Sequence, residues 1–122
     1  MPTPAVPVDS PSGRVVPFLK AGLPSFVASP DYRLVAGNDD LPGVILAAYG
    51  RFLARLAKAG AAADLARGVA AIEALHGWGD EAVRTAIRDE FIESLDGDED
   101  ALALIRPLLG SALAAELAEI LG

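Results

Sequence analysis

The sequence predicts an all-α protein, on three observations. Apolar residues recur at three- and four-residue steps over most of the chain, which is the spacing of one helix face. The two-residue alternation typical of strands is nowhere sustained, and short groups of turn-forming residues separate the periodic segments. Short connections favour antiparallel neighbours, and no repeat period is visible. We therefore expect about five to six helices in an irregular stack of antiparallel hairpins, either HEAT-like or a bundle.

The chain divides into a tail and one domain. Residues 1–13 hold four of the nine prolines, together with Gly and Ser, a composition that buries too little apolar surface to fold. We expect this stretch to be a disordered tail. The rest of the 122 residues is enough for a single core, so residues 14–122 are expected to form one helical domain.

The first half of this domain alternates helices and turns. Pro24 interrupts the apolar series of residues 14–28, which predicts a kinked helix or two short helical pieces. Residues 29–42 are rich in turn formers and are expected to form a loop. Residues 41–60 form a long helix in this interpretation, and another spans about residues 62–76. The apolar stripe of the long helix is Ile45, Tyr49, Phe52, Leu53 and Leu56.

A helix with one charged face is expected after Gly79. Asp80 can cap its N-terminus, and Gly97 can end it in a left-handed conformation. Two short helices should follow, the second capped by Ser111. Their expected buried stripes are Ala101, Leu104, Ile105 and Leu108, and then Leu113, Leu117, Ile120 and Leu121.

Composition excludes several kinds of chemistry. The absence of Cys removes disulfides, thiolate nucleophiles and Cys-type zinc sites. No signal-like or membrane-length apolar run is present, so we expect a soluble, cytoplasmic protein with no membrane partner. His76 is the single histidine, and at a helix end it should contact terminal carbonyls or lie at the surface. Trp78 should anchor a turn into the core, or else be an exposed contact for a partner.

The charge is distributed unevenly along the chain. Residues 1–79 carry seven Lys and Arg against six Asp and Glu, whereas residues 80–122 carry three against eleven. The overall charge is −7. The negative electrostatic potential of such a protein repels nucleic acid and anionic lipid and attracts basic partners, so we expect no nucleic-acid binding. The alternative is that the acidic surface only maintains solubility.

The candidate partner-binding residues are the carboxylates around the end of the charged helix. They are Glu90, Glu93, Asp96, Asp98, Glu99 and Asp100. Glu93 could instead bind a neighbouring backbone group or an Arg such as Arg88. The residues from Asp96 onward do not match a calcium-binding loop, which needs Gly at its sixth position and Glu at its twelfth. Here these positions are Ala101 and Pro107. We assign no catalytic residue, no metal and no cofactor, and we expect a protein that is not an enzyme.

Two segments carry a resemblance to a known family. Residues 41–56, LPGVILAAYGRFLARL, resemble an LPYLVLGDLGRFL-type helix of a family of small helical bacterial proteins. Residues 86–113 resemble the VVVSFLEAL…ARALLGP stretch of the same family, so the similarity covers about residues 41–115. The family's Tyr and Gly-Asp fall on Gly43, Ala47 and Ala48, so a contact made by that Asp is missing. The matching residues are Leu41, Pro42, Val44, Leu46, Gly50, Arg51, Phe52, Leu53, Phe91, Glu93, Leu95, Leu108, Leu109 and Gly110.

Members of that family are often encoded beside polymorphic toxins and look like immunity proteins. The resemblance implies a cytoplasmic, non-enzymatic bacterial inhibitor whose partner is a cognate toxin domain, and an acidic surface would suit a basic toxin. A second hypothesis is a helical adaptor or assembly module that receives a host protein in an apolar groove. A third is an enzyme with a carboxylate site. The Ala-rich helices leave the oligomeric state open.

Overall fold

The computed structural model describes residues 14–121, and within them the all-α prediction is confirmed. Seven α-helices are found there, rather than five to six, and this range contains no strand. The expected disordered tail, residues 1–13, lies outside the described residues. The α-helices are α1 (Val15–Gly22), α2 (Pro30–Arg33), α3 (Pro42–Lys58), α4 (Ala62–Trp78), α5 (Glu81–Ala86), α6 (Glu99–Ile105) and α7 (Ser111–Leu121). Between them lie a π-helical segment, η3 (Ile87–Ile92), and two 3₁₀ turns, η2 (Pro24–Phe26) and η4 (Arg106–Leu108).

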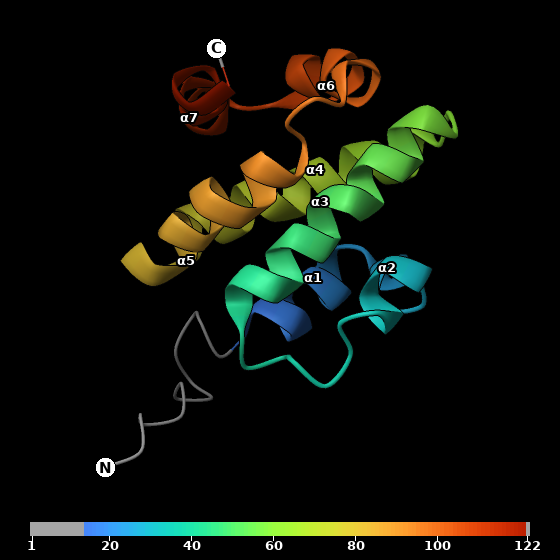
Figure 1. Cartoon of the computed structure of the whole chain (residues 1–122), viewed down its shortest axis with the longest axis vertical. Helices are drawn as coiled ribbons and strands as arrows, with labels where there is room; N and C mark the ends of the chain where they lie inside the picture. The colour runs from blue at the N-terminus through green and yellow to red at the C-terminus, as the bar shows by residue number, and fades with distance from the viewer. Residues whose placement is uncertain (1–13, 122) are drawn as a thin grey trace.

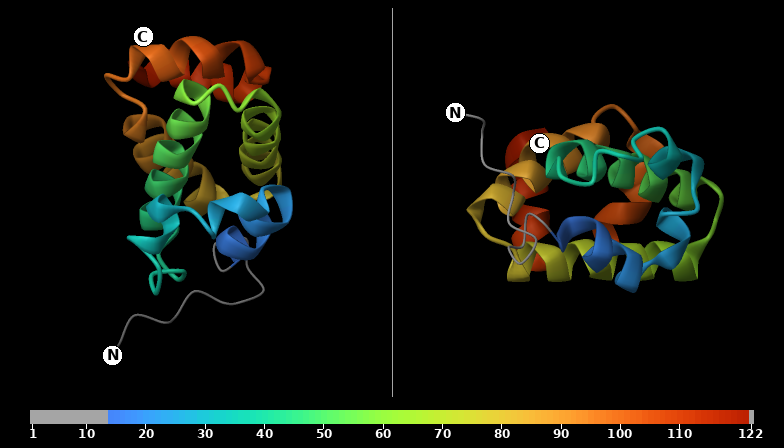
Figure 2. Two further views of the ribbon diagram at one scale, coloured as in Figure 1. Left: turned by 90° about the vertical axis from the view of Figure 1, so that its right-hand side faces the viewer. Right: turned by 90° about the horizontal axis from the view of Figure 1, so that it is seen from below.

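Helix α3 is the element against which most others pack. It contacts α2, α4, η3 and α6, while α1 lies on α4 and α7 lies on η3 (Figure 1). Helices α6 and α7 run across the end of the molecule at which α3 ends and α4 begins (Figure 2, left). The stack is therefore irregular, because its last two helices cross the ends of the others. None of the described helices is long and apolar enough to span a lipid bilayer.

The buried apolar residues form one core that draws on all the longer helices. Tyr49 is fully buried at its centre, and its hydroxyl donates a 2.7 Å hydrogen bond to the Gly68 carbonyl of α4. Phe26 meets the Tyr49 ring edge-on, with ring centroids 4.9 Å apart. Burial raises the pKa of Tyr49, so the phenol stays protonated and remains a donor. The hydrogen bond thus links α3 to α4 inside the core.

Close contact between α3 and η3 depends on Gly50. A Cβ at this position would overlap Ser94 Oγ and would lie 3.0 Å from the Phe91 carbonyl oxygen. Ser94 Oγ in turn donates a 2.6 Å hydrogen bond to that carbonyl. The missing side chain therefore lets the backbones of the two helices approach.

The region before α3 corrects one expectation. The break at Pro24 is confirmed, since α1 ends at Gly22 and a 3₁₀ turn begins at the proline. The loop expected over residues 29–42 contains the short helix α2, so that prediction was wrong in part. Ser29 caps α2 by accepting the Tyr32 N–H at 3.2 Å, and Pro30 occupies its first position.

The charged helix has the predicted ends but a different interior. The Asp80 side chain accepts the Val83 N–H at 3.0 Å, and Gly97 has a φ of 82°. Both terminal predictions are confirmed. Between them, α5 passes into the π-helical segment η3, where a wider turn replaces the regular α-helix.

The buried stripe predicted for α6 was right for Ala101 and Ile105 but wrong for Leu104 and Leu108. Leu102 is buried, whereas Leu104 and Leu108 are 50 % and 42 % exposed. The alternative stripe, which includes Ala101 and Ile105, has helical spacing too, and packing against α3 selects it. The stripe of α7 is as expected, although Ser111 is its first residue rather than a cap before it.

We expect Gly50→Ala to destabilise the fold by about 1–3 kcal/mol, as overpacking in a core does. Gly77→Ala is the matched control, because Gly77 is also in a helix but has nothing within 4 Å of its Cβ position. That change should be neutral or stabilise by up to about 1 kcal/mol, through helix propensity alone. Urea unfolding followed by circular dichroism measures both. Equal effects of the two substitutions would contradict the packing at Gly50.

Candidate functional site

The six candidate carboxylates lie along one continuous segment, from within η3 to the first turn of α6. Glu90 is in η3, Asp98 precedes α6, and the others are exposed on the segment between them or in the first turn of α6. Leu95 is fully buried and fixes the middle of this segment to the core. Gly97 then reverses the chain with its positive φ. The structure therefore presents a short acidic turn on a fixed backbone.

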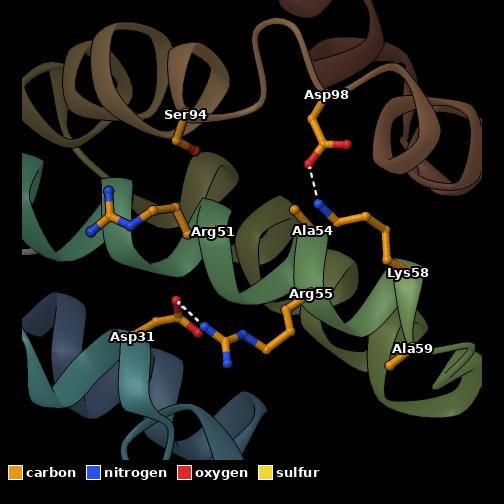
Figure 3. Close-up of a pocket in the computed structure, with 8 residues that line it drawn as sticks. All are labelled: Asp31, Arg51, Ala54, Arg55, Lys58, Ala59, Ser94 and Asp98. Atoms are coloured by element: carbon orange, nitrogen blue, oxygen red, sulfur yellow. Dashed lines mark hydrogen bonds and ion pairs between the residues drawn. The ribbon is translucent and has the colours of Figure 1, made fainter.

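Asp98 has a structural role within this turn. Its side chain caps α6 by accepting the Ala101 N–H at 3.3 Å. It also accepts a 2.7 Å hydrogen bond from the Lys58 ammonium at the end of α3 (Figure 3). These two donors, Lys58 first, hold the pKa of Asp98 below its ordinary value of 3.8. Asp98 is accordingly engaged within the protein.

Glu90, like Asp98, differs from the other candidate carboxylates because it contacts another part of the protein. It lies over the first turn of α3, where a Cβ on Gly43 would be 3.0 Å from Glu90 Cγ and 3.5 Å from Glu90 Oε1. Helix α3 begins at Pro42, and Leu41 before it provides no side-chain cap, so a carboxylate near this N-terminus is favourable. Glu90 thus contributes to the packing of η3 on α3.

The remaining four carboxylates are free within the described residues. Their side chains are exposed and have no hydrogen bond or ion pair to any residue between 14 and 121. The rival expectation for Glu93 is wrong, because Arg88 pairs with Glu119 of α7 at 3.7 Å. We call this set the acidic surface: Glu93, Asp96, Glu99 and Asp100.

A charged groove of about 520 Å³ adjoins the acidic surface along α3. Figure 3 shows its residues, which are Asp31, Arg51, Ala54, Arg55, Lys58, Ala59, Ser94 and Asp98. Arg55 pairs with the buried Asp31 at 3.2 Å, as Lys58 does with Asp98, so two of its three cations are neutralised. The Arg51 guanidinium has no partner among the described residues.

Sequence reasoning did not find this groove. In the sequence, Arg51, Arg55 and Lys58 are typical of the solvent face of a helix, and Asp31 falls within the loop expected over residues 29–42. A usable signal was the spacing of the three cations, which puts them on one helix face. The groove presents both signs of charge beside the acidic surface.

His76 and Trp78, the other two residues singled out in the sequence, lie outside the acidic surface and the charged groove. His76 Nε2 lies 3.4 Å from Glu116 Oε2 of α7, and both side chains are mostly buried. Trp78 is 43 % exposed and stacks on Phe18 with ring centroids 5.1 Å apart, so it is not enclosed in the core. Among residues 14–121 no three Asp, Glu or His side chains are grouped to hold a metal ion.

The comparisons identify the family. The model of a domain of unknown function, DUF7674, matches residues 17–121. The chain belongs to the DUF7674 family. The match runs from α1 to the end of α7, so the acidic surface and the charged groove both lie within the DUF7674 domain. No curated protein and no solved structure matches the chain.

We expect Lys58→Gln to raise the pKa of Asp98 part of the way back toward 3.8, because the Ala101 N–H still donates. The native pKa lies below the unfolded value. The pair therefore stabilises the fold above the unfolded pKa, and this contribution is lost as the pH falls through the folded pKa. In the variant, stability should depend less on pH across that acidic range.

Carboxyl NMR titration measures the pKa, and acid unfolding measures the stability. Lys20→Gln removes an exposed cation from α1 and is the control, with the Asp98 pKa unchanged. An Asp98 pKa that is the same in Lys58→Gln and wild type would contradict the ion pair.

Proposed function

We propose that this chain is a bacterial immunity protein that binds and neutralises a cognate toxin through the acidic surface. The observation that carries the proposal is the set of four exposed, unpaired carboxylates between residues 93 and 100. Exposed charges without internal partners add nothing to the packing of the fold, but they can pair with Arg and Lys of another protein. The resemblance of residues 41–115 to immunity-type proteins supports the same function.

The fixed backbone under the acidic surface favours binding over solubility alone. Solubility needs only net charge, and it places no demand on where the carboxylates lie. Here Leu95, Gly97 and the cap of α6 hold the turn in one conformation. A partner then loses less conformational entropy on binding, and the clustered charge speeds its association.

The partner in this proposal is a toxin domain with a basic surface, and the site of action is the bacterial cytoplasm. Toxins that cleave nucleic acids need cationic clefts for the phosphate backbone, and an acidic protein surface can block such a cleft. The acidic surface would then act by occlusion, with no catalytic residue, metal or cofactor in the inhibitor. The charged groove beside it offers Arg51 for an acidic group at the rim of the same cleft.

The adaptor hypothesis is less well supported. Receiving a host peptide needs a groove long enough for several side chains. The larger groove is lined by charged residues, and the apolar hollow near α6 has a volume of only about 250 Å³. Neither offers a continuous apolar channel, so we favour a surface-to-surface complex.

Co-expression with the toxin domain encoded beside the gene tests the proposal. We expect cell survival together with co-purification of a one-to-one complex, because neutralisation by occlusion requires a lasting contact. A catalytically inactive toxin variant controls for expression, and it should co-purify equally well. Survival without a complex would contradict occlusion and indicate enzymatic reversal of the damage. If the cells do not survive and no complex is found, this outcome would contradict the immunity function and favour the adaptor hypothesis.

A further inference from the structure

An apolar hollow lies where α6 and η4 cover the turn between α3 and α4. Four leucines line it, Leu56, Leu65, Leu104 and Leu108, together with small residues of the turn from Ala57 to Ala62. Leu104 of α6 and Leu108 of η4 are 50 % and 42 % exposed, and both line this one hollow. Apolar surface gathered in a concave place marks a contact site more often than scattered exposed leucines do.

We propose that this hollow receives one aliphatic or aromatic side chain of the partner protein, flanked there by Lys or Arg. Its volume of about 250 Å³ is below the roughly 300–1,000 Å³ of sites for small molecules. That space suits a single large side chain, the kind of anchor that dominates protein interfaces.

The charges at the rim determine what flanks the anchor. Asp100 lies one turn before Leu104 on the same face of α6, and Asp64 lies one turn after Ala61 on α4. Neither carboxylate has a hydrogen bond or ion pair among the described residues. The two cations nearest in sequence to the lining residues both interact within the chain: Lys58 pairs with Asp98, and Arg106 has an interaction of its own. The unpaired charge at the rim is therefore negative, which favours a basic surround in the partner.

The hollow lies next to the acidic surface, since Asp100 of that surface is one helical turn from Leu104, which lines the hollow. This inference rests on the proposed function for the identity of the partner, and it moves the centre of the interface onto α6. An apolar anchor inside a ring of charge pairs is the arrangement that excludes water from a binding hot spot. The carboxylates of the acidic surface would then determine the rate of association, and the hollow would determine the lifetime of the complex.

A peptide titration tests the hollow without any toxin. The probe is acetyl-Arg-Phe-Arg-amide, added at millimolar concentration to the isotope-labelled protein, and methyl NMR reports its position. We expect shifts at the methyl groups of Leu56, Leu65, Leu104 and Leu108. Acetyl-Glu-Phe-Glu-amide is the matched control and should shift them several-fold less. Absence of these shifts with the basic peptide, or equal shifts with both peptides, would overturn the proposal.

The complex tests the same hollow through the double variant Leu104→Gln and Leu108→Gln. Both leucines are exposed, so circular dichroism should show an unchanged fold. We expect the Kd for the toxin domain to rise at least about ten-fold, mainly through faster dissociation. Leu34→Gln is the control, because Leu34 is 82 % exposed and lies outside the hollow. Its Kd should stay within about two-fold of wild type.

The outcomes separate the two claims. Binding of wild type with no loss in the double variant would overturn the hollow and leave the immunity function standing. Absence of binding by wild type would overturn the immunity function, and the peptide titration alone would then decide the hollow. A wild-type dimer that the double variant dissociates in sedimentation would also overturn the proposal, since the occupant would be a second copy.

Discussion

The hydrogen bond from the buried Tyr49 hydroxyl to the Gly68 carbonyl fixes the structure around which the other helices pack. A buried hydroxyl without an acceptor costs about 1–3 kcal/mol, so this pair selects one alignment of α3 against α4. Gly68 is suited to the position, because a Cβ there would overlap Leu53 Cδ2 and crowd Leu23. The alignment of α3 and α4 also sets the turn between them. Helix α6 packs over that turn, so the hollow and the end of the acidic surface, Glu99 and Asp100, both depend on it.

The sequence predicted the helices whose apolar residues keep one period. Helices α3 and α4 begin and end within a few residues of the expected positions, because their stripes are long and their ends carry turn formers. The π-helical η3 was not predictable, since its apolar residues also fit a regular α-helix. In α6 two stripes were possible, and only contact with α3 buries Leu102 and exposes Leu104. Periodicity gives the existence of a helix, and tertiary packing decides its rotation.

The candidate site was predictable in composition but not in the role of each residue. Clustering of acids along residues 90–100 is visible in the sequence. Asp98 accepts a hydrogen bond from Lys58, which is 40 residues away in the chain. A contact between residues so far apart cannot be recognised from the local sequence. Glu90 meets Gly43 through the packing of η3 on α3. The hollow combines residues of α3, α4 and α6, so it became visible only once these helices were placed together.

The most direct test of binding through the acidic surface is the rate of association with the toxin domain after charge reversal. Glu93→Lys with Asp96→Lys alters the acidic surface, and Asp40→Lys with Glu81→Lys makes the same change in net charge. These control residues lie in the segment before α3 and at the start of α5, far from α6 (Figure 1). We expect the association rate at low salt to fall about ten-fold or more for the first pair only, and the difference to shrink as salt is added. Equal rates for the two pairs would contradict binding through the acidic surface, because net charge alone would then explain any effect.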